Sequence, residues 1–454
     1  MKDQMTRRDC LRIMGMSGFG IGSGFVINRQ LLAQDIVESS FESSVIAANK
    51  VQENRSNAVL IDGKVIQPQR QLPVLTETDV LVVGGGSAGI VAAIAASRAG
   101  AKVTIVERYG HFGGLWTGGL VLTILGHIAQ GPNQVCQGIG EEMMRRLDKM
   151  DCAIINRKPG CNPIVDSEAV KYLMVEMIEE ANVQVFLHCW GVEAVTQDNS
   201  IHGAVFESKS GRQAILAKVV IDATGDGDIF AAAGAQFEHR SHNVGLASRI
   251  GNLDRVDETK TLETEKPKRL GSVTPVHGVN WVNLIGPEVD GLDLATLTRM
   301  EMNHRKYIWK KIQKIRNVPG YNKVYLLETA PQLGVRITRI LNGLKTVKVD
   351  DIKNSTRYPD VIGVGGASHA EHAEWQIPYG ALIPQNIDNV LAAGRCISCD
   401  LRMADLVRLI PNCFVTGHAA GVAAAVAVRD RCKPRDADIT EIQKILRQQE
   451  AYLG

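Results

Sequence analysis

The sequence lacks the features that mark several large classes of protein. Of its 454 residues only 5% are aromatic, the formal net charge at pH 7 is +2, and no basic run is interleaved with aromatic side chains. Such a chain has no electrostatic footprint for nucleic acid, so we expect no nucleic-acid partner. The nine cysteines are scattered, and a hydrophobic content of 45% suffices for one large two-part unit or two domains.

Residues 1–34 are predicted to be a targeting signal. Arg7 and Arg8 lie in the stretch TRRDCLR, which resembles the twin-arginine export motif. The glycine-rich stretch that follows, residues 13–27, is too short for a comfortable membrane span. We therefore expect the twin-arginine export machinery as a partner, a periplasmic or otherwise exported location, and no membrane span in the mature chain. A signal that is not cleaved would leave an anchor.

Residues 35–76 are predicted to form a linker or surface arm. Their composition is polar and mixed, and the one strand pair expected lies around residues 57–66. Asp62 and Gly63 in the middle of that stretch are typical of a two-residue hairpin turn. The first compact domain is expected to begin at residue 77.

The stretch DVLVVGGGSAGIVAAIAASRAGAKVTIVE, from Asp79 to Glu107, predicts a strand, a glycine turn, a helix and a second strand. Gly84 permits the tight turn, Gly86 lets the backbone approach a pyrophosphate, and Gly89 lets helix and strand pack closely. The helix N-terminus favours an anion, and Glu107 can accept hydrogen bonds from ribose hydroxyls. The chain is thus predicted to bind a dinucleotide in a Rossmann-like α/β domain.

The choice between FAD and NAD depends on the residues after this fingerprint. The next loop, RYGHFGGLWTGGLV, holds Gly113, Gly114, Gly118 and Gly119. Such a density of glycine suits a chain that passes close to a flat, bulky ligand. NAD enzymes seldom need a second loop of this kind, so the pair of loops favours FAD.

Between about residues 65 and 428 the chain resembles the FAD-dependent oxidoreductases with a glutathione-reductase-like FAD domain, related to fumarate reductase flavoproteins. Four motifs carry the resemblance in family order: VVGGGSAGIVAAIAASRAGAKVTIVERYGHFGG, VVIDATGDGDIFAAAGA, ETAPQLGVRITRI, and IPYGALIP with VLAAGRCIS and VRLIPNCFVTGHAAGVAAA. The resemblance implies an enzyme with a Rossmann-like FAD domain that contains an inserted β-meander. A second, substrate-covering α+β region accompanies it. The expected division is 77–235 and 385–432 for the FAD domain, 236–384 for the covering region and 433–454 for a tail helix.

The resemblance also assigns residues to the cofactor. Val192 is expected beside the adenine, and a helix whose N-terminus lies around Thr416 is expected to point at the flavin, where it stabilises negative charge. Motifs and resemblance together place the following residues at FAD: Gly84, Gly86, Ser87, Ala88, Gly89, Glu107, Arg108, Gly113, Gly114, Val192, Ala223, Thr224, Gly225, Gly394, Arg395, Gly417, Ala420 and Gly421.

The middle of the chain predicts local structure but few sites. Strands at 183–188, 191–197, 201–208 and 213–217 would form the meander before a last strand at 218–222. The pair Asp226 and Asp228 lacks further ligands at calcium-loop spacing, so no metal is expected. GVGGAS at 363–368 lacks the third glycine of a second fingerprint. Basic residues of a predicted helix at 294–315 are interpreted as a solvated face.

Candidates for substrate chemistry are charged residues near the expected flavin. Arg336 and Arg339 in GVRITRI offer forks for a substrate carboxylate, with a salt bridge to the FAD domain as the alternative. Arg408, in VRLIP, lies where the resemblance places substrate over the flavin. His369 is a candidate acid or base, the alternatives being a metal ligand or a solvated loop residue. His418 is a candidate donor at the flavin or a packing histidine.

These residues predict an exported FAD-dependent dehydrogenase or oxidase that moves a hydride between a small polar substrate and flavin N5. The electron acceptor is left unidentified. Two alternatives remain open. One is a flavin-linked thiol-disulfide enzyme that uses Cys396 and Cys399. The other is a protein that binds FAD without catalysis.

Overall fold

The computed structural model describes residues 58–128, 133–158, 160–367 and 374–454. The predicted signal at 1–34 and His369 lie outside these described residues. The described chain opens with a hairpin in which β1 (Val59–Ile61) pairs antiparallel with β2 (Lys64–Ile66). Asp62 and Gly63 at its turn have φ values of 49° and 73°, the conformation that a two-residue hairpin turn requires. The hairpin predicted from these two residues is confirmed.

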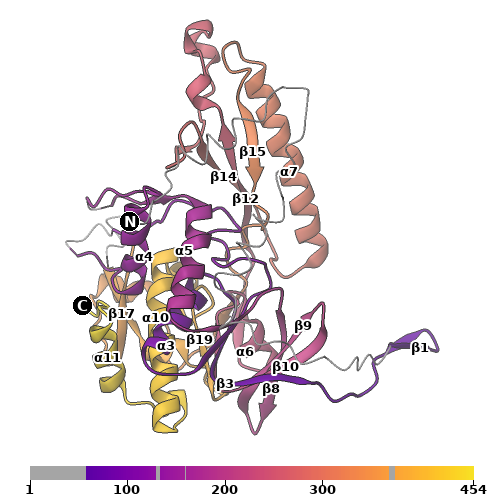
Figure 1. Cartoon of the computed structure of the whole chain (residues 1–454), viewed down its shortest axis with the longest axis vertical. Coiled ribbons are helices and arrows are strands. Elements are labelled where there is room, and N and C mark those ends of the chain that lie inside the picture. The colour runs from indigo at the N-terminus through magenta and orange to yellow at the C-terminus, as the bar shows by residue number, and fades with distance from the viewer. Residues whose placement is uncertain (1–57, 129–132, 159, 368–373) are drawn as a thin grey trace, which may run out of the picture. The chain divides into compact units, whose positions relative to one another are not determined.

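A seven-stranded sheet carries the glycine fingerprint (Figure 1). Its order is β7-β4-β3-β10-β9-β8, and β19 joins it beside β10. Strands β3, β4, β7 and β19 are parallel to the second half of β10, whereas β9 pairs antiparallel with its first half. This is the Rossmann-like α/β arrangement with an inserted meander. The bounds are β3 (Val74–Val83), β4 (Val103–Val106), β7 (Gln184–Phe186), β8 (Trp190–Gln197), β9 (Ser200–Ser208), β10 (Gly211–Asp222) and β19 (Val390–Ala392).

Two details of the predicted meander need correction. The strand expected at 183–188 is β7, which pairs parallel with β4 at the opposite edge of the sheet from β8. The strands expected at 213–217 and 218–222 form the single strand β10. The reason is that β10 has partners along its whole length: β3 on one side, and first β9 and then β19 on the other.

Two buried helices pack against each other beside this sheet, α3 (Ser87–Arg98) and α10 (Ile410–Asp430). Their backbones are close because Gly417 and Gly421 have no side chain. A Cβ at either position would lie 2.2 Å from the carbonyl oxygen of Ala88 or Ala92, respectively. The glycines of α10 therefore serve helix packing.

Among the described helices, α10 is long and apolar enough, by length and composition, to cross a membrane. The mean hydropathy of its most apolar window is 1.3, but 94% of that window is buried inside the protein. We therefore interpret α10 as a core helix, because its apolar surface is already covered by α3 and the sheet.

Several further elements join the same core. β17 (Val361–Gly366) pairs antiparallel with β18 (Glu374–Pro378) and packs on α10, so the GVGG sequence lies in a strand and not in a nucleotide-binding turn. Residues 361–367 and 374–384, grouped above with the covering region, thus share the core of the FAD domain. Outside the covering sheet and α7, the remaining helices and strands, whether or not they join this core, are α4 (Ile139–Lys149), α5 (Ser167–Glu180), α6 (Asp228–Ala232), α8 (Val349–Lys353), α9 (Leu401–Val407), α11 (Ile439–Gln448), β5 (Ala153–Ile154), β6 (Ile164–Val165), β11 (Phe237–His239) and β16 (Arg339–Leu341).

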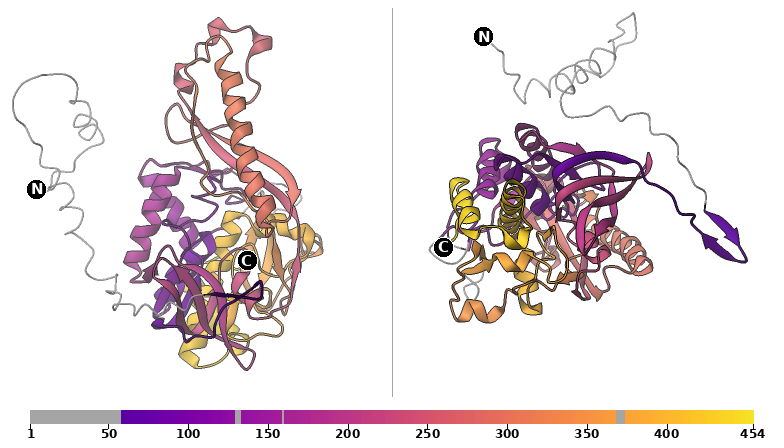
Figure 2. Two further views of the ribbon diagram at one scale, coloured as in Figure 1. Left: turned by 90° about the vertical axis from the view of Figure 1, so that its right-hand side faces the viewer. Right: turned by 90° about the horizontal axis from the view of Figure 1, so that it is seen from below.

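The covering region is built on an antiparallel sheet of order β13-β14-β12-β15, backed by the long helix α7 (Leu294–Arg316) (Figures 1 and 2). The α7 residues Ile308 and Ile312 and the β12 residues Leu246 and Ile250 belong to a second hydrophobic core. The expected helix at 294–315 is thus confirmed. The strands are β12 (His242–Gly251), β13 (Ser272–Val273), β14 (Asn280–Val289) and β15 (Tyr325–Thr329).

Candidate active site

A crevice of about 880 Å³, counted to its open mouth, follows the carboxyl ends of four parallel strands. Val83, Val106, Ala223 and Ala393, at or just after the ends of β3, β4, β10 and β19, all line it. Ligands of open α/β sheets bind at this edge. Of the predicted cofactor residues, the lining includes Gly84, Gly86, Ser87, Ala88, Glu107, Arg108, Gly114, Ala223, Thr224, Gly225, Gly394 and Arg395.

The three glycines of the fingerprint differ in what surrounds them. A Cβ on Gly84 would lie 2.5 Å from the carbonyl oxygen of Ala223, and one on Gly89 would lie 1.8 Å from that of Gly84. A Cβ on Gly86 would meet nothing within 4 Å. Gly84 and Gly89 therefore allow tight packing of strand and helix, while Gly86 leaves open the space that a pyrophosphate fills at the N-terminus of α3. The residues present fit FAD at this position.

The second glycine loop lies directly against the first. The backbone N–H of Gly113 donates to the carbonyl oxygen of Gly85 at 2.8 Å, and Gly86 and Gly113 form a parallel bridge. Gly113 itself is not among the lining residues, whereas Gly114 is. Gly113 thus joins the two loops, and Gly114 forms part of the wall.

The end of the crevice near Glu107 carries aromatic residues that the sequence motifs did not indicate. The Glu107 carboxylate accepts hydrogen bonds from the backbone N–H groups of Gly85 at 2.6 Å and Tyr109 at 2.9 Å. Each of its oxygens keeps a lone pair for a ribose hydroxyl. The Arg108 guanidinium lies 4.8 Å from the ring centroid of Tyr109 and 5.9 Å from that of Trp190. Tyr109 and Trp190 both line the crevice, so they offer flat surfaces to an adenine.

Val192, which was expected beside the adenine, is not among the residues that line the crevice. The wall here consists of Cys189, Trp190 and Gly191, at the start of β8. Val192 lies one residue further along the strand.

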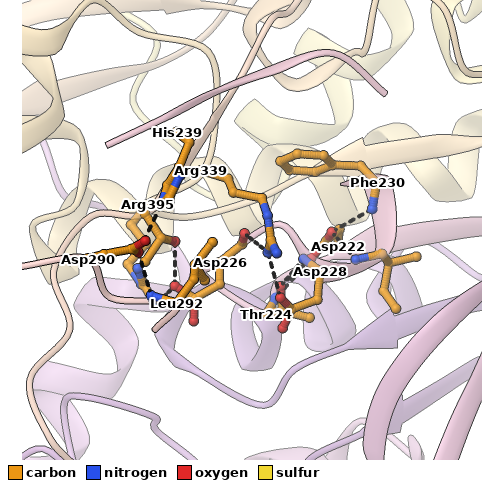
Figure 3. Close-up of polar contacts among 12 residues, drawn as sticks. Asp222, Thr224, Asp226, Asp228, Phe230, His239, Asp290, Leu292, Arg339 and Arg395 are labelled. Carbon is orange, nitrogen blue, oxygen red and sulfur yellow. Dashed lines mark hydrogen bonds and ion pairs between the residues drawn. The ribbon is translucent and has the colours of Figure 1, made fainter. Parts of the chain in front are cut away.

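The ATGDGD loop is held by a network of acidic and basic side chains (Figure 3). The buried Asp222 carboxylate accepts hydrogen bonds from the backbone N–H groups of Ile229 and Phe230, both at 2.9 Å, at the N-terminus of α6. Its other oxygen accepts a hydrogen bond from the Thr224 hydroxyl at 2.7 Å. Asp222 therefore fixes the loop whose backbone lines the crevice.

Asp226 and Asp228 join this loop to the covering region (Figure 3). Asp226 Oδ1 accepts from Arg395 Nη2 at 2.7 Å and from the Thr338 hydroxyl at 2.6 Å. Asp228 Oδ1 accepts from Arg339 Nη1 at 2.8 Å. Both carboxylates are thus ion-paired, and Arg339 makes the salt bridge to the FAD domain that was weighed as the alternative to substrate binding.

A second cavity, of about 1350 Å³ counted to its mouth, adjoins the crevice, and we call it the chamber. Leu115, Arg395, Arg408 and Ile410 line both cavities, so the two lie directly beside each other. The β12–β14 sheet supplies one side of the chamber. Small residues of β12 leave the space open, and apolar side chains of β14 and of the loop after Gly119 line it: Gly245, Ala247, Trp281, Ile285, Val121 and Leu125.

The charged groups of the chamber are three arginines, and none of its described lining residues is acidic. Arg336 lines only the chamber, and within the described chain its guanidinium has no hydrogen-bond or ion-pair partner. Burial lowers the pKa of Arg336, and the nearby charge of Arg408 lowers it further. Arg408 is paired with Asp405, and Arg395 with Asp226. An unpaired, half-buried guanidinium beside a second arginine is suited to bind an anion.

The predicted role of α10 needs correction. The helix begins at Ile410, and Ile410 and Cys413 of its first turn line the crevice. Residues further along, expected at the flavin, lie in the helix interior. Gly417 and Gly421 pack on α3, and Ala420 is fully buried.

His418 also lies away from both cavities. Its Nε2 is 2.8 Å from Gln449 Oε1, and a Cβ on Gly138 would lie 2.8 Å from the His418 ring. Burial lowers the pKa of His418 to about 4. The expectation of a donor at the flavin must therefore be corrected, because the structure places His418 as a packing residue.

The thiols of the Cys396–Cys399 pair are also buried away from both cavities. Cys396 is fully buried and Cys399 is 6% exposed, and neither lines the crevice or the chamber. Burial raises the pKa of both thiols, in the case of Cys399 to about 12. Buried, protonated thiols are poor nucleophiles, so this placement does not support thiol-disulfide chemistry.

Fold and site together define a flavoprotein whose dinucleotide crevice adjoins a second cavity, the chamber. The family model "FAD dependent oxidoreductase" matches residues 79–270 and 246–446. The chain belongs to this family of FAD-dependent enzymes.

Individual relatives are distant. The chain is 27% identical over 181 residues to the thiamine thiazole synthase of Methanococcus vannielii, covering 38% of this chain and 65% of that protein. It is 32% identical over 110 residues to the urocanate reductase of Eggerthella lenta, covering 22% of this chain and 18% of that protein. The chain thus spans less than two thirds of these curated relatives. A geranylgeranyl bacteriochlorophyll reductase-like structure from Thermoplasma acidophilum matches with 15% identity and a TM-score of 0.44, over 83% of this chain and 84% of that one.

Proposed function

We propose that this protein is a dehydrogenase or oxidase that moves a hydride between a small anionic substrate and flavin N5. The observation that carries the proposal is the Arg336 guanidinium, which has no partner among the described residues and lines a chamber that adjoins the FAD crevice. When bound, FAD supplies the hydride acceptor or donor. The residues that would hold it are the lining residues of the crevice named above.

The charged and the apolar residues of the chamber bind different parts of the proposed substrate. Arg336 and Arg408 attract and orient a carboxylate or similar anion, because a guanidinium can donate two parallel hydrogen bonds to it. Trp281 and Ile285 offer apolar surface to the rest of the substrate. The Trp281 ring is held in place, since its Nε1 donates to the Leu120 carbonyl oxygen at 2.5 Å. We therefore refine the expected small polar substrate to an anion with an apolar body.

The test is anaerobic mixing of the FAD-loaded protein with carboxylates and with their matched neutral amides. We expect carboxylates to bleach the visible flavin band and the amides to fail. Equal bleaching by both would contradict the role of the arginines. Bleaching by dithionite alone would favour the alternative of an FAD-binding protein without catalysis.

A matched pair of variants tests whether Arg336 binds the substrate anion. Arg336→Met removes the unpaired guanidinium and is expected to raise KM for a carboxylate roughly 10- to 100-fold, the cost of losing charge-assisted hydrogen bonds. Arg402→Met is the control, because Arg402 has a side chain 64% exposed and lines neither cavity. An unchanged KM in Arg336→Met would count against the anion site.

Export through the twin-arginine route is a separate proposal, supported by Arg7 and Arg8 in the motif and by the need of that route for a cargo folded around its cofactor. Replacement of both arginines by lysine should retain the protein in the cytoplasm. Normal export of that variant would contradict the proposal.

A further inference from the structure

The hairpin β1–β2 exposes an unusual amount of aliphatic surface. Five of the six residues in its two strands are aliphatic, and each is more than 40% exposed: Val59, Leu60, Ile61, Val65 and Ile66. Leu60 and Val65 lie opposite each other across the hairpin and are 73% and 74% exposed. An isolated two-stranded hairpin is only marginally stable in water, and a contiguous apolar patch on a soluble protein marks an interface. The hairpin therefore needs a partner.

The segment that follows the hairpin is a spacer that separates it from β3. Residues 67–73, QPQRQLP, contain two prolines and no helix or strand, and they separate β2 from β3. Extended, they span roughly 23 Å at about 3.3 Å per residue, and the prolines make such a spacer semi-rigid. Figures 1 and 2 show the hairpin apart from the sheets and helices that follow it. We call residues 58–73 the arm.

The outer edges of β1 and β2 differ in how well each can pair with a strand of another chain. β2 carries Lys64, and lysine on an edge strand discourages pairing with another chain. β1, with the sequence VLI, carries no charge. In the described chain β1 pairs with β2 alone, so its other edge presents free backbone N–H and C=O groups. The edge of β1 is thus the open one.

We propose that the arm pairs through β1 with β1 of a second copy of this chain, antiparallel about a two-fold axis at Leu60. In this register Leu60 faces its own counterpart and Val59 faces Ile61, so every cross-strand pair is aliphatic. A two-fold interface requires a surface that complements itself. The aliphatic strand β1 meets this requirement. The product is a four-stranded sheet, β2-β1-β1-β2, which exceeds the three strands that independent stability requires.

The charges of the hairpin favour a second copy over other partners. Its charged residues are Asp62 at the turn and Lys64 in β2, and both lie outside the proposed strand pair. An anionic lipid surface would call for a cluster of basic residues, which the hairpin lacks. The inference is independent of the proposed function, since the arm lines neither cavity.

Cysteine cross-linking of the full, FAD-loaded chain tests the register. Directly opposed residues of antiparallel strands have Cα atoms about 4.5–5.5 Å apart, which a disulfide can bridge. Leu60→Cys should therefore give a covalent dimer on mild oxidation. Val65→Cys is the matched control, because its counterpart would be three strand spacings away, about 14 Å. A dimer formed as well by Val65→Cys, or by neither variant, would overturn the register.

Light scattering on the same chain tests whether the partner of the arm is a second copy. We expect a dimer for the unaltered chain and at least a tenfold weaker dimer for Leu60→Glu, with unchanged flavin content and melting temperature. Leu262→Glu should leave the dimer intact, since Leu262 is 68% exposed but lies outside the arm. A monomeric unaltered chain would overturn the proposal, as would a dimer that resists Leu60→Glu. So would an arm that binds lipid vesicles or a different protein in place of a second copy.

Discussion

Arg408 donates from Nε and from Nη2 to one carboxylate oxygen of Asp405, at 2.9 and 2.5 Å. The other oxygen of Asp405 lies 3.3 Å from His242 Nε2. Burial alone would raise the pKa of Asp405, but Arg408 and His242 outweigh burial and hold that pKa below its ordinary value. Asp405 thus fixes the orientation of Arg408 in the chamber, whereas the Arg336 guanidinium has no such partner in the part of the chain that the structure describes.

Arg408→Ala should keep FAD bound and lose reduction of the flavin by substrate, because Arg408 lines the chamber as well as the crevice and holds the proposed anion. Asp405→Asn should have a smaller effect, an increase in KM of several-fold with FAD affinity unchanged, since exposed ion pairs contribute up to about 1 kcal/mol. Steady-state kinetics and flavin absorbance measure both. Loss of FAD from Arg408→Ala would show that Arg408 holds the cofactor instead.

The same pair predicts a pH effect. A carboxylate with a lowered pKa keeps its pairing above its ordinary range and loses it as pH falls through the lowered value. KM of the unaltered enzyme, counted on the ionised form of the substrate, should therefore be constant from neutral pH down to below the ordinary pKa of aspartate and rise only at lower pH. Asp405→Asn should lack this acidic rise. A rise of KM between pH 6 and 8 attributable to Asp405 would contradict the pairing.

The glycines of the two motifs predict opposite phenotypes. Gly86→Ala adds a Cβ with nothing within 4 Å at a residue whose φ is −68°, so the fold should keep its stability. FAD affinity should fall, because the methyl group occupies space that the pyrophosphate needs. Gly417→Ala places a Cβ 2.2 Å from the Ala88 carbonyl oxygen, so it should destabilise the protein, by about 1–3 kcal/mol for overpacking.

Two measurements distinguish the role of Gly86 in FAD binding from the role of Gly417 in helix packing. They are the FAD dissociation constant and the melting temperature of the FAD-free protein. Gly86→Ala should change the first and leave the second, and Gly417→Ala should lower the second. Identical behaviour of the two variants would mean that one of these glycines has been assigned to the wrong surroundings.

Much of the FAD domain could be predicted from sequence because its signals are local. In the stretch from Asp79 to Glu107 a strand, a turn, a helix and a second strand follow one another in register, and all were found. Gly417 and Gly421 were misassigned for a physical reason. Glycine allows close approach of a ligand and close approach of another helix equally well, and the sequence around it does not say which neighbour comes near.

The chamber could be predicted only in part. Arg336 and Arg408 lie in recognisable motifs, but Trp281 and Ile285 come from a sheet whose pairing partners lie far along the chain. Trp190 is a single aromatic residue at the start of a strand, and no spacing rule marks it. Whether Arg336 is paired depends on long-range contacts, and these are what local sequence patterns do not contain.

The carboxylate of Glu141 bridges the buried His127 and the partly exposed Arg157. Its Oε2 lies 2.9 Å from Nε2 of the fully buried His127, and its Oε1 accepts from Arg157 Nη2 at 2.6 Å. Burial alone would raise the pKa of Glu141, but the hydrogen bonds and charges of His127 and Arg157 outweigh it and lower the pKa to about 2. The Glu141 side chain is only 12% exposed, so solvent screens these contacts little.

A carboxylate with a lowered pKa stabilises the fold above its ordinary value of about 4.5, and this contribution disappears as pH falls toward 2. Glu141→Gln should therefore lower the free energy of unfolding at pH 7 by about 3 kcal/mol, from about 1.4 kcal/mol per unit of pKa. Glu168→Gln is the control, because the Glu168 side chain is 61% exposed and its pair with Lys171 should contribute under about 1 kcal/mol. Urea unfolding of the FAD-loaded proteins between pH 7 and pH 3 measures both. The deficit of Glu141→Gln should be constant from pH 7 to about pH 5 and shrink below, since the unfolded state of the unaltered protein then binds a proton that the folded state does not. A deficit that grows with falling pH, or one no larger than that of Glu168→Gln, would refute the assigned role of this buried cluster.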